Sequence, residues 1–401
     1  MSSSCPQSVT VRPDPCKGAS HKGFGATGTA SWVLLIADDL TGACDSGLAF
    51  AQAGLRVRVQ LGALGADRAK AADVLVLSSD TRNAEPEEAR ARMESFGAMR
   101  GFSGNILFHK VDSAGRGNPG TEMLALMEIS GSAAVVYAPA YPAAGRTVEH
   151  GLLRVRDFRG QDTEKSLLEL IPEQARERVA LLACDEIEQL RKQMLAAHAA
   201  GKTIWLCDAT EQKHLEHVAE ATEGLLSRLF FSGSAGLAEA VAGRLKSGLK
   251  ENGFHDVLPK TQGRCLVICG TDHPVTLAQM HALIPRATVL TLEGNETLPT
   301  TGCGVVTMDW ETATVESFQR FWKRAEASGP MERLVMTGGA TAAFVLAALG
   351  AEALLLGGAL EQGIPWSVVE GGMAAGRVAI TKSGGFGTEL SLARAAGFLD
   401  S

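Results

Sequence analysis

Short apolar runs recur along the chain and predict its secondary structure. From Ser31 onward each run is rich in β-branched or aliphatic residues and ends in small or polar residues, and helical periodicity follows. Strands and helices that alternate in this way form mainly parallel sheets covered by helices. The predicted strands of the first half are VLLIA, VLVLS, ILFHK, AAVVYA, TIWLC and RLFFS.

A second series of runs follows the stretch 248–263, which is rich in Gly, Pro and charged residues. It comprises CLVIC, ATVLTL, GVVTM, RLVMT, ALLLG and RVAIT. We therefore predict an α/β fold of two domains, each a mainly parallel sheet flanked by helices, with a boundary near residue 255. The domains would span 31–255 and 256–401. Residues 1–30, rich in Ser, Gly, Thr and Pro, are expected to form a flexible N-terminal extension.

Composition and charge narrow the range of partners. The chain has 401 residues, with 38 Lys and Arg against 45 Asp and Glu, a net charge of −7 and no Lys/Arg-rich block. Nucleic acid is therefore not an expected partner. The eight cysteines, several of them in apolar runs, are typical of reduced thiols in a cytoplasmic protein. No apolar stretch approaches the roughly 20 residues that span a bilayer, and the N-terminus lacks the apolar segment of a signal peptide, so neither a membrane nor secretion is expected.

Polar and charged residues follow the predicted strands of the first half. In open α/β sheets, ligands bind beyond the carboxyl ends of the strands. Arg and Lys can hold a carboxylate there, and Asp can accept hydrogen bonds from hydroxyls. This half is therefore suited to a hydroxy acid or sugar. The residues concerned are Asp38, Asp39, Asp80, Thr81, Arg82, Lys110, Asp112, Ser113, Arg116, Asn118 and Asp208.

Glycine-rich turns occupy the same positions in the second half. They are the segments 270–273, 338–341 and 382–387, and most of them precede a predicted helix. Backbone N–H groups in such turns can approach phosphate oxygens, and the partial positive charge at a helix N-terminus adds to the attraction. The second half is therefore predicted to bind phosphates.

Three other motifs stand in the wrong context. The G-x-G-x-x-G of 23–28 precedes its strand, whereas a dinucleotide fingerprint follows a strand and opens a helix. The triplet Gly-Lys-Thr of 201–203 leads into a strand and lacks the upstream glycine of a Walker A loop. No second Cys or His pair follows Cys265 and Cys269, so no metal ligand is assigned.

Seven motifs resemble, in their order along the chain, the four-carbon acid sugar kinases, a family also labelled domain of unknown function 1537. They are IADDLTGACDSGLAFAQAG, KVDSAGRGNPGTE, APAYPAAGRTV, FSGSAGLAEA, GTDHPVTLAQ, TGGATAA and KSGGFG. The resemblance covers residues 33 to about 390. It implies an N-terminal acid-sugar-binding domain, a C-terminal ATP-binding domain and an active site in the cleft between them. It also implies phosphoryl transfer from ATP, with Mg²⁺, to a hydroxyl of a small threonate-, erythronate- or 3-oxo-tetronate-like acid.

The site residues follow from these motifs and from the strand ends. We expect Asp39 to orient or deprotonate the attacking hydroxyl, because a carboxylate at a strand end can point into the cleft, and Asp38 is the second candidate. The expected substrate-binding residues are Arg82, Lys110, Asp112, Ser113, Arg116 and Asn118. The expected nucleotide-binding residues are Thr271, His273, Gly338, Gly339, Ala340, Thr341, Lys382, Gly384, Gly385 and Gly387.

Structural roles are open alternatives for several of these side chains. Either Asp39 or Thr41 can cap the helix predicted over 42–53. His273 can lie in a capped, solvated turn, and Lys382 can be a solvated lysine at the sheet edge. The cations of the first half can instead form salt bridges: Lys110 and Arg116 with Asp112 or Glu122, and Arg82 with Glu85, Glu87 and Glu88.

The chain departs from the family pattern at three places. Ala114 and Gly115 follow Ser113 where the family usually has Thr and Leu, Ala340 replaces a usual Glu, and Gly385 replaces a usual Asn. These changes indicate a divergent member, and a non-catalytic acid-sugar or nucleotide sensor is the alternative function. A dinucleotide-dependent oxidoreductase is disfavoured, because no correctly placed fingerprint is present. The sequence leaves open whether the chain forms a homodimer.

Overall fold

The computed structural model describes residues 33–61, 72–96, 106–156, 160–225, 229–245, 264–294, 296 and 301–398. The predicted N-terminal extension, its glycine motif and the predicted domain boundary near residue 255 lie outside these ranges.

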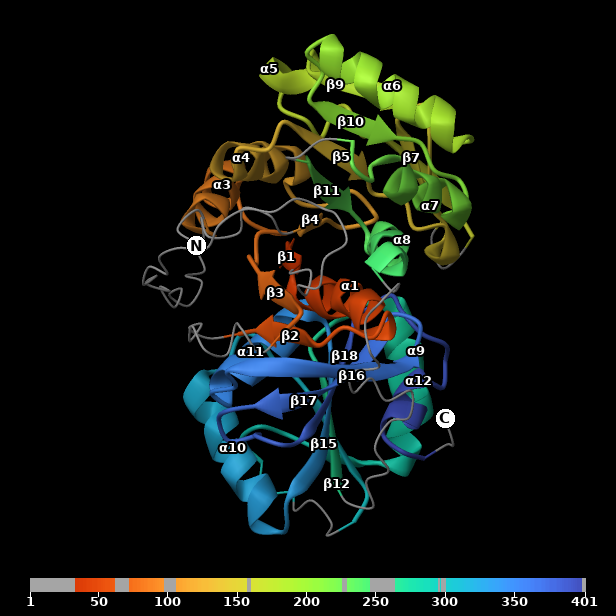
Figure 1. The fold of residues 1–401 in the computed structure, drawn as a ribbon. Helices are drawn as coiled ribbons and strands as arrows, with labels where there is room; N and C mark the ends of the chain where they lie inside the picture. Colours follow the sequence, from red (N-terminus) through yellow and green to blue (C-terminus); the bar gives the residue numbers. More distant parts are fainter. Residues whose placement is uncertain are drawn as a thin grey trace.

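Fifteen strands of the described chain form one continuous sheet (Figure 1). In this sheet, the strands of the N-terminal half are parallel to one another. The central strand β1 is buried at every position, as expected for a strand covered on both faces. The spatial order is β2 (Val57–Gln60), β3 (Val74–Ser78), β1 (Val33–Ala37), β4 (Ile106–Lys110), β11 (Leu229–Gly233), β5 (Ala134–Ala138), β10 (Ile204–Cys207) and β9 (Val179–Leu182).

The strands of the C-terminal half continue the same sheet. Five of them are parallel, and the last two are antiparallel. The mainly parallel sheet predicted from the sequence is thus confirmed. The spatial order is β13 (Thr288–Leu290), β14 (Cys303–Thr307), β12 (Arg264–Cys269), β15 (Met331–Thr337), β18 (Val378–Lys382), β17 (Ile364–Glu370) and β16 (Ala353–Glu361).

The two halves are joined at β2 and β16, which pair antiparallel and place Leu355 opposite Arg58. Arg58 is buried at this junction, and its guanidinium donates to Glu370 at 2.7 and 3.2 Å and to Gln60 at 2.8 Å. The sequence predicts a main sheet for each half, whereas the described strands of the two halves join in one main sheet. The larger apolar core includes residues from both halves, among them Val33 and Leu354.

Helices cover both faces of the sheet (Figure 1). In the N-terminal half α1, α8, α7 and α6 pack against one another in that order, and α3 packs against α4; in the C-terminal half α9 packs against α12 and α10 against α11. The helices are α1 (Leu40–Gln52), α3 (Pro86–Ser95), α4 (Pro119–Ser130), α5 (Glu173–Arg176), α6 (Ile187–Ala199), α7 (Gln212–Ala221), α8 (Ala235–Leu245), α9 (Pro274–Leu283), α10 (Val315–Ala327), α11 (Gly339–Ala348) and α12 (Ser391–Ala395).

Helix α1 lies where the two halves meet. It contacts β1 and β3 on one side and β16, β17, β18 and α11 on the other, and most of its residues are buried. A side chain at Gly47 would place its Cβ 2.8 Å from Leu356 of β16, so the glycine permits this close approach. The first turn of α1, which follows Asp39, is therefore held between the strand ends of both halves.

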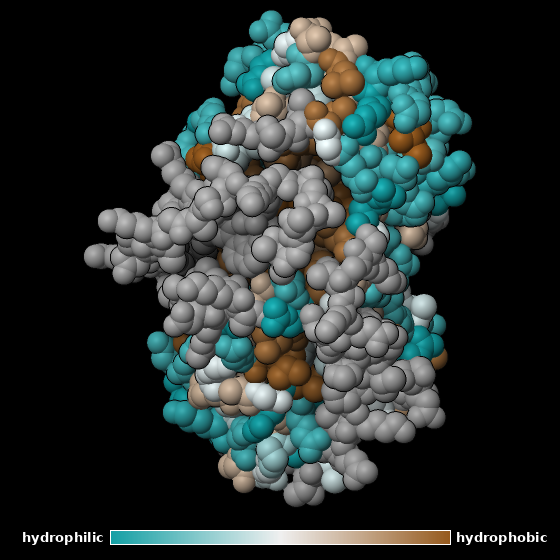
Figure 2. Space-filling view, in the orientation of Figure 1, coloured by the Kyte–Doolittle hydropathy of each residue, from teal (hydrophilic) through white to brown (hydrophobic). Residues whose placement is uncertain are grey.

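A separate three-stranded antiparallel sheet projects from the N-terminal half. It consists of β6 (Arg146–Glu149), β7 (Leu152–Arg156) and β8 (Asp162–Ser166). Figure 2 shows hydrophilic residues over much of the upper helices and apolar residues near the middle of the same face. Among the described residues, no helix is both long and apolar enough to cross a bilayer.

Candidate active site

Three charged residues form a buried ion cluster at the carboxyl ends of β1 and β3. The Arg82 guanidinium donates to both oxygens of Asp38, at 2.9 and 2.7 Å, and to Oδ2 of Asp39 at 2.6 Å. Burial raises the pKa of Asp38, although the charge of Arg82 opposes this effect. Burial would lower the pKa of Arg82, but the two carboxylates outweigh it and raise the pKa. The expected salt bridges of Arg82 with the acidic run 85–88 are wrong in their partners. Arg82 pairs with Asp38 and Asp39, and Glu88 pairs with Arg92.

Asp39 is also the N-cap of α1. Its Oδ1 accepts from the backbone N–H of Gly42 at 2.7 Å, and its Oδ2 accepts from the Thr41 hydroxyl at 2.7 Å. The capping alternative for Asp39 is thus confirmed, since an extended residue before a helix is the standard position for such a cap. Both carboxylate oxygens have partners, and the proposed role as base stays a prediction.

Asp112 and Arg116 form a second ion pair beside the first. Arg116 donates to the two Asp112 oxygens from Nε at 2.6 Å and from Nη2 at 3.1 Å. Burial would raise the pKa of Asp112, but the bonds from Arg116 and the charge of Arg82 hold it well below its usual range. The salt-bridge alternative for Arg116 is confirmed with Asp112 and wrong for Glu122, which pairs with the buried His109 at 2.9 Å.

Lys110 lies in the same region but forms no ion pair with a described carboxylate. It is 5% exposed, and its ammonium donates to the Val111 carbonyl at 2.9 Å. In the part of the chain that the structure describes, Lys110 has no carboxylate within 4.0 Å, so the salt-bridge alternative for this residue is wrong. Ser113 follows closely and is half-buried. Lys110 and Ser113 both line the small pocket described below.

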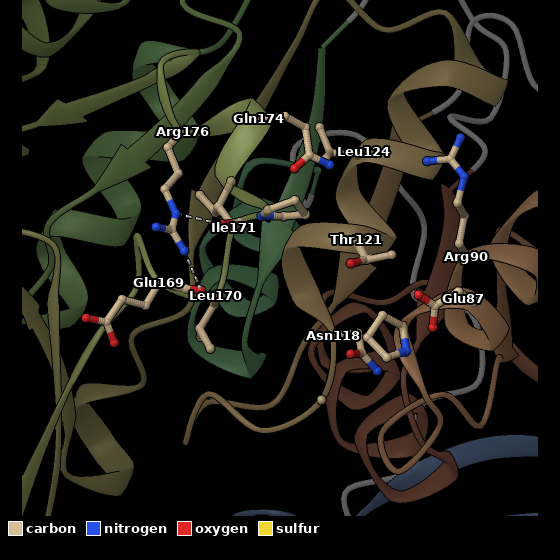
Figure 3. A pocket seen from close by; sticks show the side chains of 13 residues that line it. Glu87, Arg90, Asn118, Thr121, Leu124, Glu169, Leu170, Ile171, Gln174 and Arg176 are labelled. Atoms are coloured by element: carbon tan, nitrogen blue, oxygen red, sulfur yellow. Dashed lines mark hydrogen bonds between the residues drawn. The ribbon is translucent and has the colours of Figure 1, made fainter.

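Asn118 stands apart from these groups. Its amide donates to the Ala84 carbonyl at 2.7 Å just before α4 begins. It lines the larger pocket, about 530 Å³, which is bounded by α3, α4 and the segment 169–176 (Figure 3). Arg176 closes the far side with bonds to the carbonyls of Ile171 and Glu169. Among the predicted substrate residues, only Asn118 lines this pocket.

The first two predicted phosphate-binding turns lie at the N-termini of α9 and α11. His273 is the N-cap of α9 and accepts from the Val275 N–H through Nδ1 at 3.3 Å. The capped-turn alternative is therefore confirmed for His273. Burial lowers its pKa, and the charges of Lys382 and Arg116 add to this effect. The second turn begins at Gly338, whose φ of +101° favours glycine.

Thr341 carries a buried polar atom that lacks a partner. Its Oγ1 is fully enclosed in the first turn of α11 and has no hydrogen bond. Because a buried hydroxyl without a partner is costly, this atom is suited to contact with a bound ligand. The neighbouring Ala340 is exposed, so the family's usual Glu at this position would extend into solvent without displacing any atom.

The third turn, 383–387, is organised by Lys382. The ammonium donates to Thr276 Oγ1 at 2.9 Å and to the carbonyls of Ser383, Gly384 and Phe386 at 3.0 to 3.3 Å. Lys382 is 1% exposed, so the expectation of a solvated lysine is wrong. Burial lowers its pKa to about 8.

The glycines of this turn pack against the start of α9. A Cβ at Gly384 would lie 3.0 Å from both Thr271 Oγ1 and His273 Cβ. A Cβ at Gly385 would lie 3.2 Å from His273 Nε2. The change from the family's usual Asn to Gly385 therefore gives the imidazole room. Gly387 has a φ of +87° and closes the turn.

The acidic strand end and the glycine turn of α11 are in direct contact. A Cβ at Gly339 would lie 2.8 Å from Asp39 Oδ2 and 3.3 Å from Thr41 Oγ1. A small pocket of about 30 Å³ lies beside this contact. Its lining comes from both halves of the chain: Thr41, Gly42, Asp45, Arg82, Lys110, Asp112, Ser113, Gly363, Ser383 and Phe386.

Sequence reasoning missed several side chains around this small pocket. Asp45 lines it from the second turn of α1, and Arg146 packs over the Phe386 ring at 5.8 Å. Tyr141 accepts from Gln362 at 3.2 Å, which links the halves again. Asp45 and Arg146 both belong to motifs that carry the family resemblance. Neither follows a predicted parallel strand, so the search at strand ends did not include them.

Known proteins resemble this chain over most of its length. Residues 33–241 match the family described as a sugar-binding N-terminal domain, and residues 311–392 match a nucleotide-binding C-terminal domain. The D-threonate kinase of Cupriavidus necator is 33% identical in an alignment of 411 positions, which covers 90% of this chain and 96% of that protein. The chain belongs to the four-carbon acid sugar kinase family. Two further relatives are similar to this family member. The 3-oxo-tetronate kinase of Brucella melitensis is 25% identical over 88% of this chain and 93% of that protein. The D-erythronate kinase of Heliobacterium modesticaldum is 30% identical over 47% of each chain.

Solved structures share the fold of this family member. A Salmonella typhimurium protein is similar with a TM-score of 0.69 at 20% identity, and the match covers 92% of this chain and 99% of that chain. A Haemophilus influenzae protein labelled DUF1537 is similar with a TM-score of 0.66 at 21% identity, over 91% of this chain and all of the other. The α/β architecture is therefore that of the family.

Proposed function

We propose that this protein transfers the γ-phosphoryl group of ATP to a hydroxyl of a four-carbon sugar acid of the threonate, erythronate or 3-oxo-tetronate type. The observation that supports it best is the contact between Gly339 and Asp39. It brings a glycine turn suited to phosphates next to a strand end suited to a hydroxy acid. Phosphoryl transfer requires mainly this kind of positioning, together with charges that offset the moving group.

The described residues fit a nucleotide. Two helix N-termini and the turn 383–387 present backbone N–H groups, and Thr341 Oγ1 is an enclosed donor without a partner. Thr271, His273 and the glycines of these turns would hold the phosphates, and Lys382 would keep the third turn in shape. ATP would supply the phosphoryl group, and Mg²⁺ would accompany it.

The fit to Mg²⁺ rests on the nucleotide rather than on a protein cage. Within the described ranges, no group of three or more His, Cys, Asp or Glu side chains is placed to hold a metal ion. Mg²⁺ usually takes only one or two carboxylates together with phosphate oxygens and water. This preference agrees with the contact of Asp39 with the turn of α11, and we propose no further ligand than Asp39 and its neighbour Asp38.

On the acid-binding side, the proposed roles follow from which charges are already paired. Lys110 has one backbone acceptor and would contact the oxygens of the transferred group. Arg82 holds Asp38 and Asp39 in place, and Arg116 does the same for Asp112. Asp39 would accept a hydrogen bond or a proton from the attacking hydroxyl, at the cost of its bond to Thr41.

ADP formation measured with ATP, Mg²⁺ and a panel of acids tests the proposal. The panel contains D-threonate, L-threonate, D-erythronate and a 3-oxo-tetronate, and D-threonate comes first because two relatives named D-threonate kinase match about 90% of this chain. We expect turnover with at least one acid. ATP binding without turnover on any acid would overturn the kinase and support the sensor alternative.

A further inference from the structure

Arg146 carries a half-buried guanidinium that forms no ion pair with a described carboxylate. It begins β6, and its Nε is enclosed without a hydrogen-bond partner. In the described chain its guanidinium forms no ion pair within 4.0 Å, and it stacks over the Phe386 ring. Burial lowers its pKa. A half-buried cation in this state is costly unless an anion completes the site.

Asp45 is an anion in the wall of the small pocket. It lies on α1 in the turn after the Asp39 cap, and it lines the pocket beside Lys110 and Phe386. No described residue donates a hydrogen bond to its carboxylate or forms an ion pair with it. Burial raises its pKa to about 6, and the charges of Lys110 and Arg146 oppose the shift.

Asp45 and Arg146 are close enough to stabilise one another's charge but do not touch. Asp112 raises the pKa of Arg146 more than Asp45 does, and Asp45 and Arg146 each shift the pKa of the other towards its charged form. No nitrogen of Arg146 lies within 4.0 Å of an Asp45 oxygen, since no ion pair joins the two. Phe386 links the two residues, since its ring lies under Arg146 and also lines the pocket that Asp45 lines. A separated cation and anion of this kind suit a molecule with a carboxylate at one end and hydroxyls further along.

The other arginines near the pocket are already neutralised. Arg82 has three bonds to Asp38 and Asp39, and Arg116 has two side-chain bonds to Asp112. A substrate carboxylate at either arginine would compete with a fixed acid of the protein. Arg146 offers a planar guanidinium without that competition, and this geometry matches a carboxylate in a two-point contact.

We propose that Arg146 binds the carboxylate of the sugar acid and that Asp45 accepts a hydrogen bond from one of its hydroxyls. This inference rests on the proposed function for the class of substrate. It assigns the specificity for an acid, as opposed to a neutral polyol, to one side chain. Lys110 stays available for the transferred group. The acid would then bind with its carboxylate at β6 and its hydroxyls towards α1.

Binding measurements without nucleotide test the assignment of Arg146. Calorimetry compares D-threonate and D-erythronate with the neutral polyols threitol and erythritol for the wild type, Arg146→Gln and Arg146→Lys. We expect Arg146→Gln to weaken acid binding roughly 10- to 100-fold, the range for losing a charge-assisted contact, and to leave polyol binding within about threefold. Arg146→Lys keeps the charge without the planar fork and should lie between the two.

Arg154→Gln is the matched control, because Arg154 is on the neighbouring strand β7 and is paired with Glu149 and Glu164 at the surface. It should bind both acids like the wild type. Asp45→Asn should weaken the polyols and the acids alike, since it removes an acceptor of hydroxyl groups. Equal melting temperatures for the variants and the wild type show that the fold is intact.

The outcomes separate this inference from the proposed function. Acid binding that depends on Arg146, without ADP formation, would support the inference and overturn the kinase. Turnover with an unchanged preference for acids in Arg146→Gln would overturn the inference and leave the kinase standing. Failure of the wild type to bind any of the acids would also overturn the inference.

Discussion

Replacing Asp39 by Asn tests whether this residue is more than a helix cap. Asn retains an oxygen that can accept from the Gly42 N–H, so the cap survives. The amide nitrogen, however, takes the place of Oδ2, which accepts from Arg82 at 2.6 Å and from Thr41 at 2.7 Å. The substitution therefore exchanges an acceptor for a donor at the centre of the ion cluster.

The cost can be worked from these contacts. One charge-assisted hydrogen bond is lost, worth about 2 kcal/mol, while Arg82 keeps both of its bonds to Asp38 and is not left without a partner. The melting temperature should therefore fall by a few degrees. If Asp39 assists the attacking hydroxyl, turnover should fall by about a hundredfold or more, and ATP binding should stay nearly unchanged.

Turnover by ADP formation, melting by calorimetry and ATP binding by titration are measured on the same preparations. Asp73→Asn is the matched control: Asp73 is buried, accepts three bonds from Arg56 and lies at the opposite end of the β1–β3 pair from Asp39. It should lose comparable stability and keep its turnover. An Asp39→Asn protein that is destabilised but works within about threefold of the wild type would refute the base and leave Asp39 as a cap.

Three further predictions concern charge and stability. In the folded protein Lys382 has a pKa of about 8, against an ordinary 10.5, so the unfolded chain binds more protons between these pH values. The free energy of unfolding should therefore rise with pH in this range. Urea titrations of Lys382→Met should lack this rise. The same variant should weaken ATP binding about tenfold or more by calorimetry, because the turn 383–387 loses its central donor. Glu370→Gln should cost roughly 2–3 kcal/mol in urea unfolding, because Arg58 is left buried without its carboxylate, whereas the exposed Glu164→Gln should cost under about 0.5 kcal/mol.

Most of the parallel strands were predictable because they are apolar runs, whereas β2 and β9 were not predicted. VLLIA and VLVLS are buried on both faces of the sheet, so their sequences are apolar throughout and do not alternate with polar residues. β2 was missed because its sequence VRVQ contains Arg58 and Gln60, and these residues are buried only through partners far away along the chain. The pairing of β2 with β16 has no local signal, so the single sheet could not be deduced from either half.

The candidate site was predictable where it follows strand ends, and not elsewhere. Asp38, Asp39 and Lys110 do lie at the carboxyl ends of β1 and β4. The partner of Arg82 was wrongly assigned because nearness in sequence favoured the acidic run at 85–88. The fold instead brings Arg82 to Asp38 and Asp39, which precede it by 44 and 43 positions. Arg146 starts a hairpin strand after a turn, so the rule for parallel sheets could not identify it.

The pairing of β2 with β16 has a consequence for attempts to divide the chain. Either half produced alone would expose an edge strand whose backbone N–H and C=O groups have lost their partners. Such edges recruit strands from other molecules, so the isolated halves should aggregate or swap strands rather than remain as independent folding units. Adding the halves back together would restore a paired edge, and recovery of the joined form would report whether β2 and β16 recognise one another without a covalent link.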